Sequence, residues 1–382
     1  MKIGTTVATL ARVRGVMLSA LVMVFVLSAS SAFAAKHFMV IQEVFVGPPA
    51  DGLNPSLTPD QRAQYVMLRM TAQGQTLVSG TVIRVEDKDG NILGNFGQLT
   101  ANVTAGGGVG CAYPACPAII IGTQAAKNLF SFAFDRIVDG EVGRVALPAA
   151  GGRACFKDAT GGQLYDCVAW GNFSCTVANC PGGANALHSG DTNAPPIGNG
   201  CDGNFGTPAA ASTGMKFGKT VTRGTFNCAA KENSTNFALA FPKPVNNAGT
   251  NDNTDSDADG LINRLDCNTA SAALLWKPVE VSAQTVTGKP TSTDSWASQN
   301  EMSGTGITYD EIRGSLSAIN GFTDDTCHSA NGATTSATDS STPPLGDGFY
   351  YVVRADGGGS CVGTYGNLST GTSRDTSLTS CP

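Results

Sequence analysis

Charged residues are scarce in this chain, and Asp, Glu, Lys and Arg together make up only 14% of its 382 residues. Strong helix formers such as Lys and Glu are therefore rare, while Gly occurs 47 times, which is typical of a β-rich secreted protein. A basic stripe is also missing, because the formal net charge is −6 and the Lys and Arg residues are thinly scattered. We therefore predict that the protein does not bind nucleic acid.

Enzyme signatures are absent as well. There is no G-x-S-x-G motif and no glycine-rich phosphate loop with a lysine. His188 stands close to Ser189 and Asp191, but adjacency in sequence is not the geometry of a catalytic triad, and an exposed loop histidine explains it better. We predict a protein that is not an enzyme. Four carboxylates near strand ends would be the candidates for glycoside hydrolysis, although surface charges or turn caps explain them better: Glu43, Asp135, Asp139 and Glu141.

Only one long apolar run is present, and it lies at the N-terminus. Positive charges at Lys2, Arg12 and Arg14 precede the apolar stretch from Val16 to Leu27, and Ala32-Phe33-Ala34 supplies small residues at the cleavage positions. Residues 1–34 are therefore predicted to be a signal peptide, with an uncleaved anchor as the alternative. Its removal would take the net charge from −6 to −9. No later run reaches the length of a membrane helix, so we expect a secreted or cell-surface protein without a membrane span.

All twelve cysteines follow the predicted signal peptide. An even number of cysteines in a secreted chain indicates disulfides. Zinc is the alternative, but no C-x₂-C pair occurs and the three histidines (His37, His188 and His328) do not form a ligand cluster. Spacing predicts four pairs: Cys111–Cys116, Cys155–Cys167, Cys175–Cys180 and Cys201–Cys228.

Alternating apolar and polar residues predict a series of β-strands. Hydrophobic residues make up 41% of the chain, which is enough to fill folded cores. A short helix is expected over residues 55–62 and a helical turn over 123–128. The predicted strands cover residues 38–46, 64–70, 78–86, 92–96, 118–121, 129–134, 143–147, 153–156, 164–171, 280–286, 308–313 and 347–355.

The segment from Asp255 to Asp266 is an acidic run of alternating carboxylates interrupted by a glycine. Calcium takes six to eight oxygen ligands, and side chains at positions 1, 3 and 5 of such a loop converge as the chain curls around the ion. Gly260 at position 6 permits the sharp turn. The predicted ligands are therefore Asp255, Asp257, Asp259, the backbone carbonyl of Leu261, Asn263 directly or through water, and Asp266 at position 12. The alternative is a solvated acidic linker without an ion.

The loop ends in Asp266 rather than the Glu of an ordinary EF-hand, and its flanks do not predict two amphipathic helices. It therefore resembles the calcium loops of dockerin modules and thrombospondin type 3 repeats. The resemblance implies structural calcium, bound at extracellular concentrations with a dissociation constant of about 10⁻⁴–10⁻³ M.

Three strand segments before the loop resemble a bacterial secreted lamin-tail domain: Val40-Ile41-Gln42-Glu43-Val44, Tyr65-Val66-Met67-Leu68 and Tyr165-Asp166-Cys167-Val168-Ala169-Trp170-Gly171. Thr222-Arg223, Asn236-Phe237 and the proline-rich exit Pro242 to Asn247 are similar to the end of that family. The resemblance implies an immunoglobulin-like β-sandwich over roughly residues 37–248.

The C-terminal part resembles a fibronectin type III module of bacterial surface proteins. The resemblance rests on Trp296, the strand Thr308-Tyr309-Asp310-Glu311-Ile312-Arg313 and the strand Asp347 to Ala355. Cys361 and Cys381 match a variant of such modules, which suggests a Cys361–Cys381 disulfide and leaves Cys267 to pair with Cys327. Exposed aromatics that could grip a sugar or a partner are Trp170, Phe173, Tyr350 and Tyr351, although strand aromatics are more often part of a core.

Together these observations predict an all-β protein with two immunoglobulin-like sandwiches joined by a calcium loop. The expected divisions are a signal peptide at 1–34, a lamin-tail-like sandwich at 35–248 with a disulfide-rich insertion at about 175–213, a connector at 249–276 and a fibronectin-like sandwich at 277–382. The expected function is a modular extracellular protein that binds a protein or carbohydrate at the cell surface or has a structural role. A secreted hydrolase of nucleic acid or polysaccharide with accessory modules, and a self-assembling filament or matrix subunit, remain the alternatives.

Overall fold

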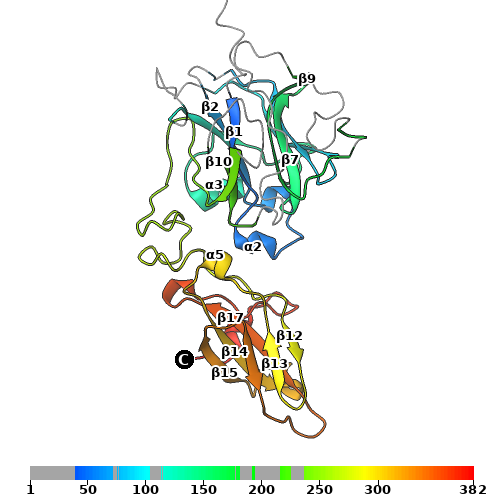
Figure 1. The fold of residues 1–382 in the computed structure, drawn as a ribbon, viewed down its shortest axis with the longest axis vertical. Helices are drawn as coiled ribbons and strands as arrows, with labels where there is room; N and C mark the ends of the chain where they lie inside the picture. Colours follow the sequence, from blue (N-terminus) through cyan, green and yellow to red (C-terminus); the bar gives the residue numbers. More distant parts are fainter. Residues whose placement is uncertain are drawn as a thin grey trace, which may run out of the picture.

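The computed structural model describes residues 39–71, 75, 77–103, 113, 115–176, 178–180, 192–193, 216–224 and 236–382. Within these residues the chain is all-β, with several mainly antiparallel sheets and only short helices, as the sequence predicts. Figure 1 shows two stacked sandwiches joined by a connector that runs along one side. The predicted signal peptide lies outside the described residues.

Two sheets form the first sandwich. The six-stranded sheet has the order β11-β10-β1-β2-β5-β6, and the five-stranded sheet has the order β4-β3-β7-β8-β9. Neighbouring strands are antiparallel except for β5 with β6 and β8 with β9. The strands are β1 (Met39–Phe45), β2 (Tyr65–Met70), β3 (Thr81–Glu86), β4 (Ile92–Leu99), β5 (Ala118–Gly122), β6 (Arg136–Ile137), β7 (Gly151–Asp158), β8 (Gln163–Gly171), β9 (Thr192–Asn193), β10 (Thr220–Arg223) and β11 (Phe237–Ala240).

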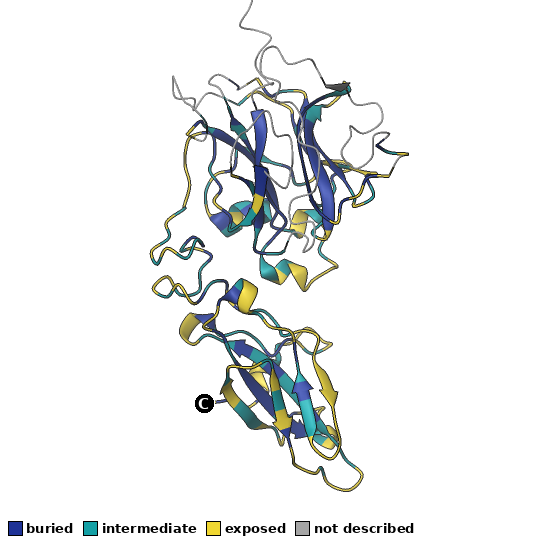
Figure 2. Cartoon of the chain, viewed as in Figure 1, coloured by how far each residue is buried: buried dark blue, intermediate teal, exposed yellow. Residues whose placement is uncertain are grey.

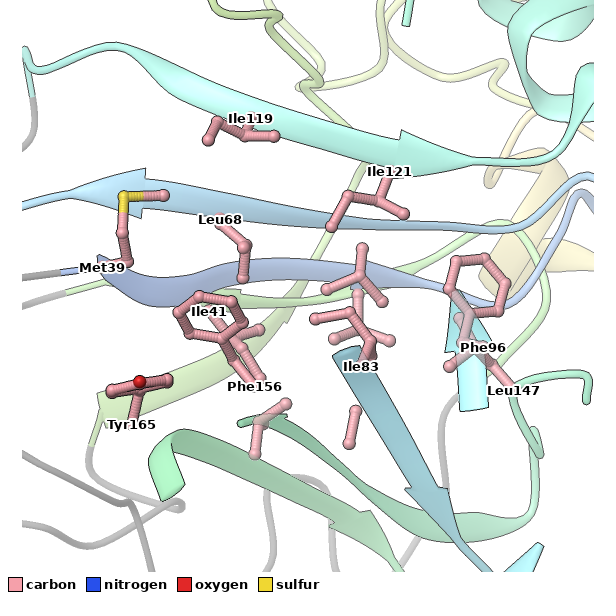
Figure 3. Packing of buried hydrophobic residues seen from close by; sticks show 14 of the residues in the cluster. Met39, Ile41, Leu68, Ile83, Phe96, Ile119, Ile121, Leu147, Phe156 and Tyr165 are labelled. Atoms are coloured by element: carbon pink, nitrogen blue, oxygen red, sulfur yellow. The ribbon is translucent and has the colours of Figure 1, made fainter. Parts of the chain in front are cut away.

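The main core fills the space between these two sheets. Side chains from both sheets interdigitate there, as Figure 3 shows for Met39 and Leu68 on one side and Ile83 and Phe156 on the other. These side chains are fully buried, and Figure 2 shows the same strands as buried along most of their length. Burial of apolar surface on this scale is the main term that stabilises the first sandwich.

The outer face of the six-stranded sheet is buried too. Its alternate side chains, among them Tyr65, pack against helix α3 (Gln124–Phe130) and against the connector. The prediction of a strand over residues 129–134 is therefore wrong. Thr123 caps α3 by accepting a hydrogen bond from the Ala126 N–H, and Ser131 ends it in the left-handed region with φ of 58°. The aromatic alternation exists because Phe130 and Phe134 both pack edge-on against Tyr65.

A buried ion pair ties the two sheets together. The Arg223 guanidinium on β10 lies 2.6 Å from the Asp166 carboxylate on β8, and both side chains are almost fully buried. The same two residues hold Ile41 at a bulge in β1: Asp166 accepts a hydrogen bond from the Ile41 N–H, and Arg223 donates one to the Ile41 carbonyl. The ion pair thus completes the hydrogen bonding of a backbone segment that the ladder leaves irregular.

The C-terminal sandwich consists of two three-stranded sheets, with the orders β12-β13-β16 and β15-β14-β17. A cluster around Trp296, Tyr309 and Val353 fills the end of the interior nearest the first sandwich. The last residues of the chain, including Tyr365 and Leu378, cover the outer face of the second sheet. The strands are β12 (Thr285–Thr287), β13 (Ser292–Ser295), β14 (Thr308–Ser315), β15 (Thr326–Gly332), β16 (Ser336–Asp339) and β17 (Phe349–Asp356).

The remaining helices are single turns. None of the helices in the described part of the chain has the length and apolarity that crossing a bilayer requires. These turns are α2 (Pro49–Gly52), α5 (Asn300–Ser303), η1 (Pro59–Gln61), η2 (Leu316–Ala318), η3 (Gly359–Cys361) and η4 (Arg374–Thr376).

Four disulfides lie within the described residues, which indicates an oxidising, extracellular type of environment. Two predicted pairs, Cys155–Cys167 and Cys175–Cys180, are confirmed. The predictions Cys361–Cys381 and Cys267–Cys327 are wrong, because Cys267 pairs with Cys361 and Cys327 pairs with Cys381. The pairs Cys111–Cys116 and Cys201–Cys228 involve cysteines outside the described residues.

Candidate calcium site

The predicted calcium loop lies in the connector between the two sandwiches. From residue 252 to residue 259, the odd-numbered side chains are half-buried and the even-numbered ones are exposed. Asp255, Asp257 and Asp259 therefore turn toward one centre, and one carboxylate oxygen of each lies within 4.8 Å of the others. Oxygens that share a calcium ion at 2.3–2.6 Å are separated by no more than about 5 Å, so the spacing fits this cation.

Five oxygen atoms of the loop and its flanks are buried and have no hydrogen-bond partner among the described residues. They come from the three aspartates, from Asp266 at the end of the loop, and from Asn253, two residues before its start. A buried polar atom without a partner costs free energy unless something else satisfies it. A hard divalent cation satisfies oxygens of this kind, and the set consists only of the carboxylate and amide oxygens that calcium prefers.

Backbone hydrogen bonds give the loop its curl. The Gly260 N–H donates to Oδ2 of Asp255 over 3.0 Å, and the Leu261 N–H donates to Oδ1 of Asp259 over 2.7 Å. Gly260 has φ of 97°, a conformation that a residue with a Cβ atom rarely adopts. Each of these aspartates thus uses one oxygen to shape the loop and leaves its other oxygen buried without a hydrogen-bond partner among the described residues.

The carboxylates repel one another. Burial, followed by the charges of Asp259, Asp257 and Asp255, raises the pKa of Asp266 to about 6. Burial and the charges of Asp257 and Asp255 likewise raise the pKa of Asp259. A cation at the centre would remove this repulsion.

Two lysines stand near the loop without filling its centre. Lys243 Nζ lies 4.0 Å from Oδ2 of Asp255. Lys219 Nζ lies 3.1 Å above the ring of Phe241, and burial lowers the pKa of this lysine to about 8. Phe241 in turn is the nearest side chain to Gly260, so the loop rests on the surface of the first sandwich.

The structure brings together three of the six predicted ligand residues, Asp255, Asp257 and Asp259, and places Asp266 near enough for their charges to raise its pKa. The side chain of Asn263 bonds the loop itself, because its Oδ1 accepts from the Ser256 N–H and its Nδ2 donates to the Ser256 hydroxyl. The side chain of Leu261 is fully buried in the core, and the role of its carbonyl stays a prediction. Asn253 was missed, although the two-residue spacing of the aspartates extends back to it.

The carboxylates considered for glycoside hydrolysis are engaged in the fold. Glu43 is buried and accepts hydrogen bonds from the Tyr65 and Thr222 hydroxyls and the Lys243 N–H, and burial raises its pKa to about 7. The others bond backbone N–H groups: Asp135 those of Ile120 and Asn247, Asp139 that of Gln124, and Glu141 that of Gln98. His37 and His188 lie outside the described residues.

The aromatics considered as ligand contacts also belong mainly to the fold. Trp170, Phe173 and Tyr350 are buried, and the hydroxyl of the partly exposed Tyr351 donates to Asp339. No protein-family model matches the chain, and no curated protein is significantly similar to it.

Proposed function

We propose that the protein is a secreted, non-enzymatic, modular extracellular protein whose two sandwiches are held in a fixed orientation by a calcium-binding connector. The observations that support this are the convergence of three aspartate carboxylates and the presence of five buried, unpartnered oxygens in the segment that joins the sandwiches. Side chains of Asn253, Asp255, Asp257, Asp259 and Asp266 would hold the ion. Calcium supplies positive charge that offsets their mutual repulsion and orders the loop around it.

The connector is attached to the first sandwich immediately after the acidic residues. Leu261, Ile262 and Leu265 are buried in the cluster that covers the outer face of the six-stranded sheet. Arg264 adds a hydrogen bond from its Nε to the Leu129 carbonyl over 2.7 Å. An ordered loop therefore holds this apolar group in place against the sheet.

The connector is also attached to the C-terminal sandwich. Asp266 is followed directly by Cys267, whose disulfide to Cys361 leads into that sandwich. Trp276 then donates from Nε1 to the Gly218 carbonyl of the first sandwich, while its backbone N–H donates to the Met302 carbonyl. Figure 1 shows the connector running from the first sandwich to the C-terminal one. An ordered loop would therefore restrain both sides of the junction.

A rigid pair of modules suits a binding or structural role, because loops and sheet edges on a fixed frame present a defined surface. The resemblance to lamin-tail and fibronectin type III modules supports the same class of function by analogy. The partner we propose is a protein or carbohydrate at the cell surface. If the role is structural, the partner would be another copy of this protein, bound through the edges of its sheets.

A calcium titration of the mature protein tests the proposal. Thermal unfolding and hydrodynamic radius are followed with calcium and with chelator, in the wild type and in the double variant Asp257→Ala/Asp259→Ala. Calcium at about ten times the dissociation constant, which is about 10 mM for the weakest affinity expected, raises the free energy of unfolding by about 1.4 kcal/mol. We expect this stabilisation and a smaller radius in the wild type, and neither response in the double variant.

Asp252→Ala is the matched control, because Asp252 is an exposed acidic residue of the same segment whose side chain points away from the centre. This variant should respond to calcium as the wild type does. If neither stability nor radius of the wild type changes up to about 10 mM calcium, the segment is an acidic linker and the proposal fails.

A further inference from the structure

The interior of the C-terminal sandwich changes from apolar to charged along its length. Strand β14 pairs in regular register with β17, so Tyr309, Glu311 and Arg313 alternate onto one face, the face turned toward the other sheet. Tyr309 belongs to the apolar cluster with Trp296. The next two inward positions carry a carboxylate and a guanidinium, where a sandwich ordinarily places apolar side chains.

Glu311 faces Asp294 of β13 across the two sheets, and the two carboxyl groups lie close enough for a hydrogen bond once one of them is protonated. The Glu311 residue is fully buried and Asp294 is 3% exposed. Neither Glu311 oxygen accepts a hydrogen bond from an N–H or O–H group of the described residues, nor does Oδ1 of Asp294. The other Asp294 oxygen accepts a hydrogen bond from the Gln284 amide.

The charged side chains around Glu311 and Asp294 also contact other residues. From β14 itself, Arg313 lies 2.8 Å from Asp339 of β16, which also accepts a hydrogen bond from the Tyr351 hydroxyl of β17. From β15, His328 Nε2 stands 3.7 Å from Glu311 Oε2 and 3.3 Å from the Thr338 carbonyl. His328 is therefore the group within ion-pair distance of Glu311, and it carries a charge only when its imidazole is protonated.

Two adjacent buried carboxylates cannot both ionise without a large free-energy cost, whereas a carboxyl and a carboxylate that share one proton form a strong hydrogen bond. We propose that Asp294 and Glu311 share a single proton in the folded protein, and that this pair is a latch between the two sheets that opens when alkaline pH removes the proton. The latch is independent of the calcium connector, because it lies within the interior of one sandwich.

The direction of the pH effect follows from linkage. Burial, together with the neighbouring Asp294, raises the pKa of Glu311 from 4.5 to about 8. Between these two values the folded protein holds a proton that the unfolded chain releases, so stability is greatest at the acidic end and falls as the pH rises. One proton changes the unfolding equilibrium constant by at most about tenfold per pH unit.

The test compares the full mature chain with its Glu311→Gln variant by urea unfolding between pH 5 and pH 9, at a fixed calcium concentration. The glutamine amide donates a hydrogen bond to Asp294 at every pH. The unfolding equilibrium constant of the variant should therefore depend less steeply on pH than that of the wild type, by a factor of up to about ten per pH unit. Subtracting the two curves also removes the contributions of other carboxyls with raised pKa values, such as Glu43 and Asp266. Glu280→Gln, which alters an exposed carboxylate of the same sandwich, should keep the wild-type dependence.

A second measurement detects the proton directly. The difference between isotope-edited infrared spectra of the wild type and of Glu311→Gln at pH 7 should contain a protonated carboxylic acid band that is lost at pH 9, and the subtraction removes the contribution of Glu43. Asp294→Asn serves if the first variant does not fold, because it removes the other half of the pair. A difference spectrum without this band at pH 7, or a pH dependence that Glu311→Gln and Asp294→Asn leave unchanged, would overturn the proposal.

Discussion

Replacing Asp166 by alanine is expected to lower the free energy of unfolding of the first sandwich by about 3–5 kcal/mol. The substitution leaves the Arg223 guanidinium buried and without its carboxylate, and it removes the acceptor of the Ile41 N–H in β1. Urea unfolding of the protein, followed by tryptophan fluorescence, to which Trp170 in β8 contributes, measures the loss.

The cost comes from breaking the pair rather than from its net strength. Burial raises the pKa of Asp166 even though Arg223 lies beside it, which means that desolvation of this carboxylate outweighs the attraction. The double variant Asp166→Ala/Arg223→Ala should therefore lose less than the sum of the two single variants, by about 0.5–3 kcal/mol. Lys88→Ala, which breaks an exposed ion pair with Asp89, should unfold like the wild type. Additive losses in the double variant would show that the two residues act separately.

Removing the Cys267–Cys361 disulfide by replacing both cysteines with serine is expected to destabilise the C-terminal sandwich by about 4–5 kcal/mol. The bond joins residues separated by 94 positions, so its loss frees a long stretch of the unfolded chain. It also detaches Asp266 of the proposed calcium site from the sandwich that follows it. Thermal unfolding with and without calcium should then show calcium stabilising the first sandwich alone.

Cys155→Ser/Cys167→Ser is the comparison, because that bond closes a separation of only 12 residues inside one hairpin. We expect a loss of about 3 kcal/mol and an unchanged calcium response at the junction. Peptide mapping without reduction checks the pairing itself. If calcium still stabilised both sandwiches after removal of the Cys267–Cys361 bond, the disulfide would not carry the coupling.

Local sequence patterns determined much of the fold. Apolar, β-branched and aromatic runs placed β1, β2, β8, β14 and β17 within a few residues of their positions, because such residues favour strands. The acidic loop was recognisable as well, since the oxygens of Asp255, Asp257 and Asp259 converge through the local curl of the chain. The pairs Cys155–Cys167 and Cys175–Cys180 were predictable because short loops bring their ends together.

The alternating pattern gave a wrong prediction where the same spacing of aromatic residues occurs in a strand and at the end of a helix. The residues 129–134 read as a core strand, yet Phe130 ends helix α3 and Phe134 follows it by four positions. Both rings pack on Tyr65 of β2, which is far away in the sequence. The alternating pattern of this six-residue segment could not show whether its aromatic side chains cover another sheet or a single aromatic ring.

What the sequence by itself determined is therefore which residues turn inward and which short segments curl, because both depend on neighbours along the chain. Only the tertiary structure decided which inward side chains meet: Cys267 with Cys361, Arg223 with Asp166, and Glu311 with Asp294. Each of these contacts joins strands or segments whose packing is set by the burial of whole sheet faces. An alternating pattern records that a side chain leaves the solvent, but it holds no information about the partner across the core.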